Sequence, residues 1–284
     1  MRERPLPKDE HGWPPKAYKN VDFLNSSAAR KIRVLCELTE PEERFARERV
    51  EDTIVMFGSA RTLPLAEAEQ RLHELEAELE GKRELTPEEA EALQVAQSRV
   101  RMAPYYEASR KLACRLTEWS KELHDKHHRF LVCSGGGPGI MEAANLGARD
   151  ANGASLGLGI SLPHEQGLNP YVTRSLSFEF HYFFIRKYWF MYLAKALVAF
   201  PGGFGTLDEL FEVLTLVQTG KVHKKVPVVL FGSAFWNQIV NFDALADWGV
   251  ISRHDLNLFK VCDDVDEAFD YITNWLTREW LTEK

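Results

Sequence analysis

The sequence predicts an α/β fold, a single domain built on a doubly wound, Rossmann-like parallel sheet. Short apolar runs rich in β-branched residues alternate with helix-periodic segments along most of the chain, which is typical of βαβ units. Two of these runs end in glycine-rich turns, at residues 134–139 and 201–205. We expect residues 51–284 to form the domain, with a helical hairpin insert at about residues 64–102. Residues 1–50 are expected to form an N-terminal arm or helical extension.

Bulk composition narrows the class of protein. The 284 residues are 45% hydrophobic and 27% charged, which is ordinary for a soluble globular chain. A net charge of −7 argues against a nucleic-acid surface. The four cysteines are scattered, with no CxxC pair, which favours reduced thiols over a zinc site or disulfides. Without an apolar signal-peptide core or a bilayer-length run, we expect a cytoplasmic protein with no membrane or nucleic-acid partner.

The first part of the chain supplies one strand and the insert. Residues 53–57 are apolar and β-branched and end at Gly58, so they predict the first buried strand. An apolar stripe over residues 65–79 predicts a helix. A capping box with proline at the first helical position opens a second helix at Thr86, which is expected to end near residue 102. A separate stripe over residues 105–123 predicts the first crossover helix.

The rest of the chain continues the alternation. We expect further strands at residues 129–133, 154–160, 175–178, 196–200, 226–231 and 258–262, and helices at 180–191, 210–217, 235–246 and 266–281. The helix at 180–191 is aromatic on all sides, which indicates burial by the core or by a second subunit. A polar loop at residues 163–170 is expected to border the site.

The segment that organises the chain is the glycine-rich turn before the helix at 210–217. Such a turn leaves backbone N–H groups free at the positive end of a helix, where a phosphate binds readily. We therefore expect Gly202, Gly203, Gly205 and Thr206 to bind a phosphate through amides and a hydroxyl. The adjacent Glu209 is a carboxylate beside an anion site, which is unfavourable unless it acts on another part of the ligand.

Alternatives exist for each charged candidate. Thr206 and Glu209 fit the S/T-x-x-E capping box, so Glu209 could serve only as a helix cap. Asp208 is expected only to favour the helix start. Arg186 and Lys187 could form structural salt bridges rather than face an anion. His181 is expected to be a core residue, and we find no convincing metal-ligand spacing.

The chain resembles the LOG ("lonely guy") family through four motifs in order. Residues 201–209 resemble its PGGxGTxxE signature, and the Arg186-Lys187 pair stands at the family's 23-residue separation from Glu209. Residues 133–142 resemble its first glycine-rich loop, and residues 58–61 resemble the turn after its first strand. LOG proteins hydrolyse nucleoside 5′-monophosphates to free base and ribose 5-phosphate, and were formerly labelled lysine decarboxylases.

The resemblance implies a set of roles. It implies an N-glycosyl hydrolase (nucleosidase) acting on AMP or a cytokinin riboside 5′-monophosphate, without a cofactor or metal, in a homodimer or a higher oligomer. Glu209 and Arg186 would be the catalytic residues. The substrate-binding residues would be Gly202, Gly203, Gly205, Thr206, Ser134, Gly135, Gly136, Lys187 and Ser59.

One alternative from another class remains. A nucleotide or molybdenum-cofactor carrier could use the same fold and glycine loops to bind without turnover. A carrier has no need of the Arg186 and Glu209 pair, which separates the two hypotheses. Amino-acid decarboxylation would require a pyridoxal-binding lysine, for which no sequence context is found.

Overall fold

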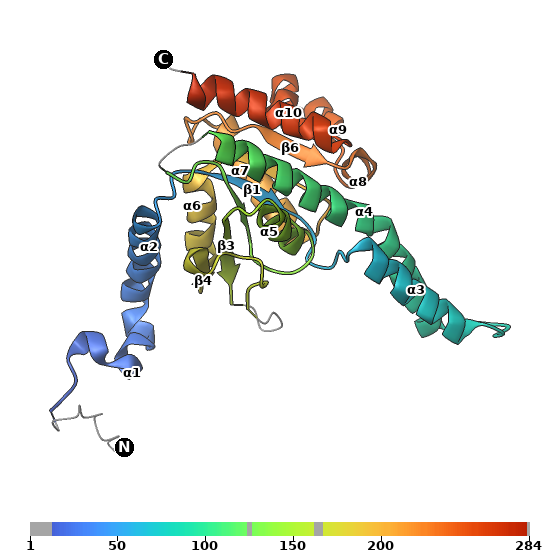
Figure 1. Cartoon of the computed structure of the whole chain (residues 1–284), viewed down its shortest axis with the longest axis horizontal. Helices are drawn as coiled ribbons and strands as arrows, with labels where there is room; N and C mark the ends of the chain where they lie inside the picture. The colour runs from blue at the N-terminus through green and yellow to red at the C-terminus, as the bar shows by residue number, and fades with distance from the viewer. Residues whose placement is uncertain (1–12, 124–126, 162–166, 283–284) are drawn as a thin grey trace.

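The structure is a computed structural model and describes residues 13–123, 127–161 and 167–282 (Figure 1). Its centre is a seven-stranded sheet with the order β4-β3-β2-β1-β5-β6-β7, in which every neighbouring pair is parallel. The strands are β1 (Thr53–Phe57), β2 (Leu131–Ser134), β3 (Ser155–Ile160), β4 (Ser177–Phe180), β5 (Ala194–Ala199), β6 (Val228–Phe231) and β7 (Phe259–Cys262). The predicted doubly wound α/β fold is confirmed.

The strand order reverses between β1 and β5. The chain moves outward from β1 through β4 on one side, and then returns to build β5, β6 and β7 on the other. Neighbouring loops leave in opposite directions at such a reversal, and open α/β sheets usually bind ligands at the carboxyl ends of the two strands. The turns after β1 and β5 both contain sequence-predicted site residues.

Helices cover both faces of the sheet. One face carries α2 (Arg30–Arg47), α6 (Phe183–Leu193), α7 (Phe204–Gln218) and α8 (Ser233–Ile239). The other carries α4 (Pro87–Glu122), α5 (Ile140–Asp150) and α10 (Val265–Leu276). The remaining helices are α1 (Val21–Leu24), α3 (Leu65–Leu79) and α9 (Phe242–Asp247). None of the helices in the described ranges combines the length and the apolar character that a membrane crossing requires.

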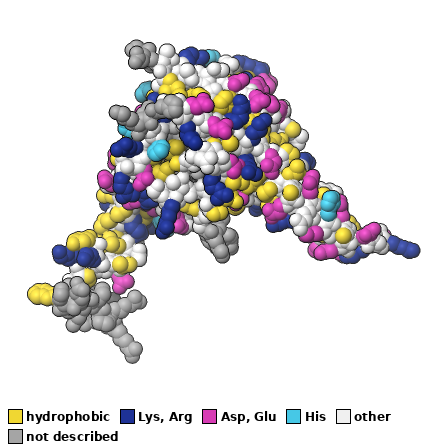
Figure 2. Space-filling model, in the orientation of Figure 1, with side chains coloured by type: hydrophobic (Ala, Val, Ile, Leu, Met, Phe, Trp, Pro, Cys, Tyr) yellow, Lys and Arg dark blue, Asp and Glu magenta, His cyan; other side chains and the backbone are white. Residues whose placement is uncertain are grey.

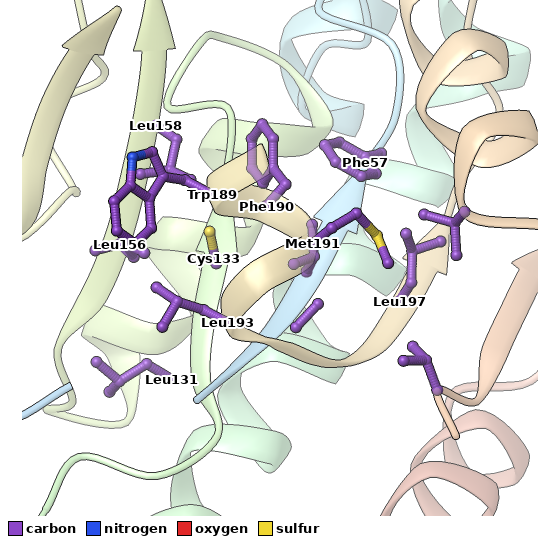
Figure 3. Packing of buried hydrophobic residues seen from close by; sticks show 14 of the residues in the cluster. Phe57, Leu131, Cys133, Leu156, Leu158, Trp189, Phe190, Met191, Leu193 and Leu197 are labelled. Carbon is purple, nitrogen blue, oxygen red and sulfur yellow. The ribbon is translucent and has the colours of Figure 1, made fainter. Parts of the chain in front are cut away.

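Strand alternation divides the core into two clusters. In β1, Val55 and Phe57 face α6, whereas Ile54 and Met56 face α4 and α5, as expected for a period of two. Trp189, Phe190 and Met191 of α6 pack over the strands in Figure 3. Burial on both faces explains why these strands are continuously apolar.

The helical insert differs from the prediction in one respect. The two helices expected at 86–102 and 105–123 are a single helix, α4, which runs through Pro104. A proline inside a helix removes one backbone hydrogen bond and crowds the preceding turn. The buried residues Ala103, Tyr106 and Leu112 anchor the helix on both sides of that defect, so it continues. The first half of α4 packs against α3, and this hairpin projects from the body (Figure 1).

Several predicted boundaries were wrong. The helix expected at 210–217 begins at Phe204, six residues earlier. The helix expected at 235–246 is divided into α8 and α9, because Asn241 caps a new start by accepting a hydrogen bond from the N–H of Ala244. The fourth strand lies at Ser177–Phe180, because residues Arg174–Leu176 form a 3₁₀ turn. Half of the polar loop expected at 163–170, residues 163–166, lies outside the described residues.

The aromatic helix is buried on one side only. Ile185, Trp189 and Phe190 of α6 are in the core, whereas Phe184 and Tyr192 are about 60% exposed in this single chain. His181, expected in the core, is exposed just before the helix. The exposed rings leave an apolar surface beside the sheet.

Candidate functional site

Three loops meet where the strand order reverses. The N–H of Ser59 donates to the carbonyl of Pro201 (2.9 Å), and the N–H of Ile140 donates to the carbonyl of Ser59 (3.1 Å). A Cβ at Gly202 would lie 2.2 Å from Oγ1 of Thr206, and one at Gly139 would lie 2.3 Å from the carbonyl oxygen of Ser59. The glycines are therefore needed because the loops approach each other too closely for a side chain.

The start of α7 is open to an anion. Gly203 is its N-cap residue, and no side chain caps the helix. Gly203, Phe204 and Gly205 are exposed, and the Phe204 side chain is 93% exposed. Uncapped N–H groups in the first turn carry the positive end of the helix dipole. This end of α7 can therefore accept a phosphate, although Thr206 itself is buried.

The structure excludes the capping-box alternative for Glu209. That alternative requires Thr206 at the N-cap position, but Thr206 is the third residue of α7. Glu209 lies about one turn further along the helix and is only 8% exposed.

The carboxyl of Glu209 has unusual electrostatics. Burial raises its pKa from 4.5 to about 7, against the opposing effects of Lys187 and then Arg186. Two neighbouring acids on the same helix, Glu212 and Asp208, add to the rise. A carboxyl that titrates near neutral pH suits proton transfer. The two cations that act on it are those predicted from the sequence.

The side chain of Arg186, on α6, contacts β3 and the loop after β2. Its Nε donates to the carbonyl of Leu158 (2.6 Å), and its guanidinium lies 5.1 Å from the ring centre of Phe190. A Cβ on Gly135 would lie 2.5 Å from its Nη2. The first glycine loop therefore makes room for this guanidinium, whose charge also acts on Glu209.

Lys187 joins α6 to α7. Its Nζ lies 2.8 Å from Asp208 and 2.7 Å from Glu212, and its side chain is 17% exposed. The expected alternative of a structural salt bridge is thus present in this structure. Asp208, expected only to favour the start of the helix, is one of the partners.

Ser134 lies beneath the first glycine loop. It is fully buried, its hydroxyl donates to Oδ1 of Asn145 (2.7 Å), and it accepts from the N–H of Gly136 (3.0 Å). This geometry makes Ser134 a support for the loop, while Gly135 and Gly136 form the loop itself. Nδ2 of Asn169 donates to the carbonyls of Gly136 and Gly137, both at 3.0 Å.

Asn145 and Asn169 are the supporting residues that the sequence analysis missed. Nδ2 of Asn169 also donates to Oδ1 of Asn145 (3.0 Å), which connects α5 to the segment after β3. A buried asparagine must find several partners. The available signal was a polar Asn145 in the middle of the otherwise apolar face of α5.

The described residues contain no group of three or more His, Cys, Asp or Glu side chains placed to hold a metal ion. The fold and these loops define a Rossmann-like α/β protein with an uncapped helix start at its topological switch point.

Comparison with known proteins shows partial similarity to one family. Residues 141–272 match the family model described as "Possible lysine decarboxylase". The chain is 29% identical over 146 residues to the probable cytokinin riboside 5′-monophosphate phosphoribohydrolase LOG4 of Oryza sativa subsp. japonica, covering 50% of this chain and 62% of that protein. It is 43% identical over 94 residues to the cytokinin riboside 5′-monophosphate phosphoribohydrolase LOG7 of Arabidopsis thaliana, covering 29% and 43%. The chain is therefore similar to LOG proteins over its central and C-terminal part.

The match to these relatives is partial, because the chain spans less than two thirds of the length of either one. Two solved structures also resemble the fold. The X-ray structure of TM1055 gives a TM-score of 0.45 at 18% identity, covering 78% of this chain and 99% of that one. The Moco carrier protein from Chlamydomonas reinhardtii gives 0.39 at 17%, covering 80% and 99%.

Proposed function

We propose that this chain hydrolyses the N-glycosidic bond of nucleoside 5′-monophosphates, releasing the free base and ribose 5-phosphate. The observation that carries the proposal is the buried carboxyl of Glu209, which has a pKa of about 7. It lies just beyond the first turn of the uncapped helix α7, and the charge of Arg186 lowers its pKa. The LOG relatives, which are named as phosphoribohydrolases of a nucleoside 5′-monophosphate, support the same reaction class.

The open end of α7 would bind the 5′-phosphate. Its exposed N–H groups at Gly203, Phe204 and Gly205 are the donors, and Gly202 lets the phosphate approach the backbone. Gly135 and Gly136 would line the opposite wall near the ribose, and Ser59 would border the phosphate from the turn after β1. Binding the phosphate at a helix start fixes the sugar without placing a cation against Glu209.

Glu209 would act at the anomeric carbon. As the C1′–N bond breaks, positive charge develops on the sugar and is stabilised by the ionised carboxylate. The oxygen of water bonds to C1′ as the C1′–N bond breaks, and one proton of the water passes to Glu209. Glu209 then returns this proton through solvent to the departing nitrogen of the base, which restores the carboxylate. Because this role needs the ionised form, activity should rise with pH through about 7.

Arg186 would stabilise negative charge, either on the departing base or on a phosphate or ribose oxygen. The hydrogen bond to Leu158 and the ring of Phe190 hold its guanidinium in place, which favours a fixed electrostatic role. Lys187 would contribute indirectly, because its ion pairs hold Asp208 and Glu212 of the helix that carries Glu209.

We propose AMP-type purine nucleotides as the substrate class, with cytokinin riboside 5′-monophosphates as the finer possibility that the names of the relatives suggest. The catalytic unit would be residues 51–284. The exposed rings of α6, including Phe184 and Tyr192, would be covered by a second copy in a homodimer, because exposed aromatic surfaces of this kind usually mark interfaces.

Chromatography of the products tests the function. Purified protein incubated with AMP is expected to release adenine and ribose 5-phosphate in equal amounts. Adenosine, which lacks the phosphate, should be a poor substrate and serves as the matched control. Tight binding of AMP with no adenine released would contradict the proposal and support a nucleotide carrier.

A further inference from the structure

Two projections with unlike surfaces extend from opposite ends of the molecule (Figure 1). The first is the N-terminal projection, defined as residues 16–35, which includes α1 and the first turns of α2. The second is the hairpin tip, defined as residues 74–93, where α3 ends and α4 begins. Neither projection carries a residue of the proposed active site.

The N-terminal projection is basic and apolar. It contains five basic residues and a single acidic one, Asp22. Its apolar side chains Tyr18, Val21 and Leu35 are 66%, 64% and 60% exposed, and Figure 2 shows hydrophobic and basic side chains together on this projection. Side chains of this size, grouped on one thin projection, indicate a surface that is covered by a partner.

Most of the basic side chains here have no acidic partner. Arg33 donates to the carbonyls of Leu24 and Ser26, which stabilises the fold of the projection. The other four are exposed, and no ion pair joins them to an acidic residue in the described part of the chain. They are Lys16, Lys19, Arg30 and Lys31.

The hairpin tip is acidic around an apolar groove. It contains eight glutamates and two basic residues, and Lys82 is already paired with Glu89. Within the described ranges, seven exposed glutamates of the tip have no ion pair. They are Glu74, Glu76, Glu78, Glu80, Glu84, Glu88 and Glu91.

The groove between the two helices has a volume of about 600 Å³, within the range of about 300–1,000 Å³ of protein ligand sites. Its apolar walls come from both sides of the hairpin turn, and glutamates stand at its rim. The apolar lining residues are Ala77, Leu79, Leu85 and Leu93.

We propose that the N-terminal projection of one copy of this chain docks into the groove at the hairpin tip of a second copy. The apolar side chains of the projection would fill the groove, and its unpaired basic residues would meet the glutamates at the rim. Charge complementarity of this kind selects the partner and its orientation. Two like projections repel each other, so the contact forms between unlike surfaces.

The geometry requires a second molecule. The two surfaces lie at opposite ends of one chain (Figure 1), so the projection of a chain is remote from its own groove. A contact between two different surfaces is heterologous, and its repetition closes into a ring or continues as an open chain. This contact is separate from any dimer formed through α6.

Sedimentation velocity on the full-length protein tests the proposal. The charge reversals Glu80→Lys and Glu84→Lys together are expected to lower the association constant by about tenfold or more. Both positions lie outside the helices or at their ends, so folding should persist. Reversal at Asp270 and Glu122, which are exposed and distant from the tip, is the matched control and should leave association unchanged.

Exchanging the charges of the two surfaces tests whether they contact each other. Arg30→Glu with Lys31→Glu should weaken association as the tip variant does, and combining the two sets should restore it. Failure of the combined variant to recover, or unchanged association in the tip variant, would overturn the proposal. The proposal would also be overturned if the wild-type chain shows no self-association that depends on the hairpin tip at any concentration. The hairpin tip would then be a surface for a different, basic partner.

Cross-linking locates the contact. Cys36 is exposed on α2, at the end of the projection. Oxidation of the Leu85→Cys variant is expected to join Cys36 of one copy to position 85 of another, and Cys36→Ser should abolish the product. A Cys36–Cys36 product in its place would show that like projections meet, which contradicts the proposed arrangement.

Discussion

The guanidinium of Arg186 occupies the space that a side chain at Gly135 would need. A Cβ at residue 135 would lie 2.5 Å from Nη2 of Arg186 and 2.7 Å from Sδ of Met141. The first glycine loop and Arg186 of α6, which are far apart in sequence, therefore form one structural unit. The loop is small at this point because the arginine lies there.

Gly135→Ala should impair the reaction more than the fold. The atoms in conflict are the ends of two flexible side chains, so Arg186 can move away and the chain still folds. We expect kcat/KM for AMP to fall by about tenfold or more, with a small change in Tm, measured by adenine release and calorimetry.

Gly220→Ala is the control with the opposite outcome. Gly220 has a φ of +66° and open space around it, so alanine there should cost about 1 kcal/mol of stability and leave turnover unchanged. Full activity in Gly135→Ala would show that the position of Arg186 is unimportant.

Burial of Glu209 should make the protein less stable as the pH rises. Its pKa is raised to about 7 in the fold from an ordinary 4.5, so the folded state prefers the protonated form. Its contribution to stability is complete below pH 4.5 and is lost as the pH rises through 7. Glu209→Gln should therefore be more stable than wild type above pH 7, by roughly 3 kcal/mol.

The difference in unfolding free energy between Glu209→Gln and wild type should disappear as the pH falls below 4.5, where Glu209 is neutral in both the folded and the unfolded state. Denaturant unfolding of both proteins at several pH values measures it. A glutamine variant that is equally stable at all pH values would mean that the carboxyl is not held in a desolvated site.

Lys187 should set the pH dependence of activity. Its charge lowers the pKa of Glu209, so Lys187→Met should move the acid limb of the pH–rate profile to higher pH. Asp208 raises the pKa of Glu209, and Asp208→Asn should move the limb the other way. Both shifts are measured from kcat/KM as a function of pH. If the acid limb stays at the same pH in both variants, it does not report the ionisation of Glu209.

Asn145 should stabilise the first glycine loop. It is fully buried and joins Ser134, Asn169 and Ser155 through hydrogen bonds. Asn145→Ala leaves these partners unsatisfied, and we expect a loss of about 2–3 kcal/mol together with weaker AMP binding. Thermal unfolding and calorimetric titration measure the two effects, and an unchanged AMP affinity would separate this network from the site.

Much of the fold was predictable because the central strands β1, β2 and β6 are buried on both faces. The central strands therefore appear as short continuous apolar runs, and β1 was predicted at its observed bounds. Helix ends were harder to predict. The sequence around Pro104 suggests two helices, yet packing on both sides of the proline maintains one.

The candidate site was predictable where local chemistry is distinctive. Glycine turns after strands and the spacing of Arg186 and Glu209 gave the site residues, whose roles stay predictions. The start of α7 at Phe204 was missed, because glycines at the N-cap (Gly203) and in the first turn (Gly205) conceal a helix that tertiary packing stabilises. The pairing of Lys187 with Asp208 and Glu212 depends on how α6 and α7 cross, which no local pattern encodes.

The most direct test of the central claim is the turnover of AMP by Glu209→Gln, measured with its affinity for AMP. The proposed phosphate site is the start of α7 and does not include the carboxyl, so we predict AMP binding close to that of wild type and adenine release reduced by about a thousandfold or more. Adenine release at the wild-type rate would contradict the assignment of Glu209 and, with it, the proposed hydrolase mechanism.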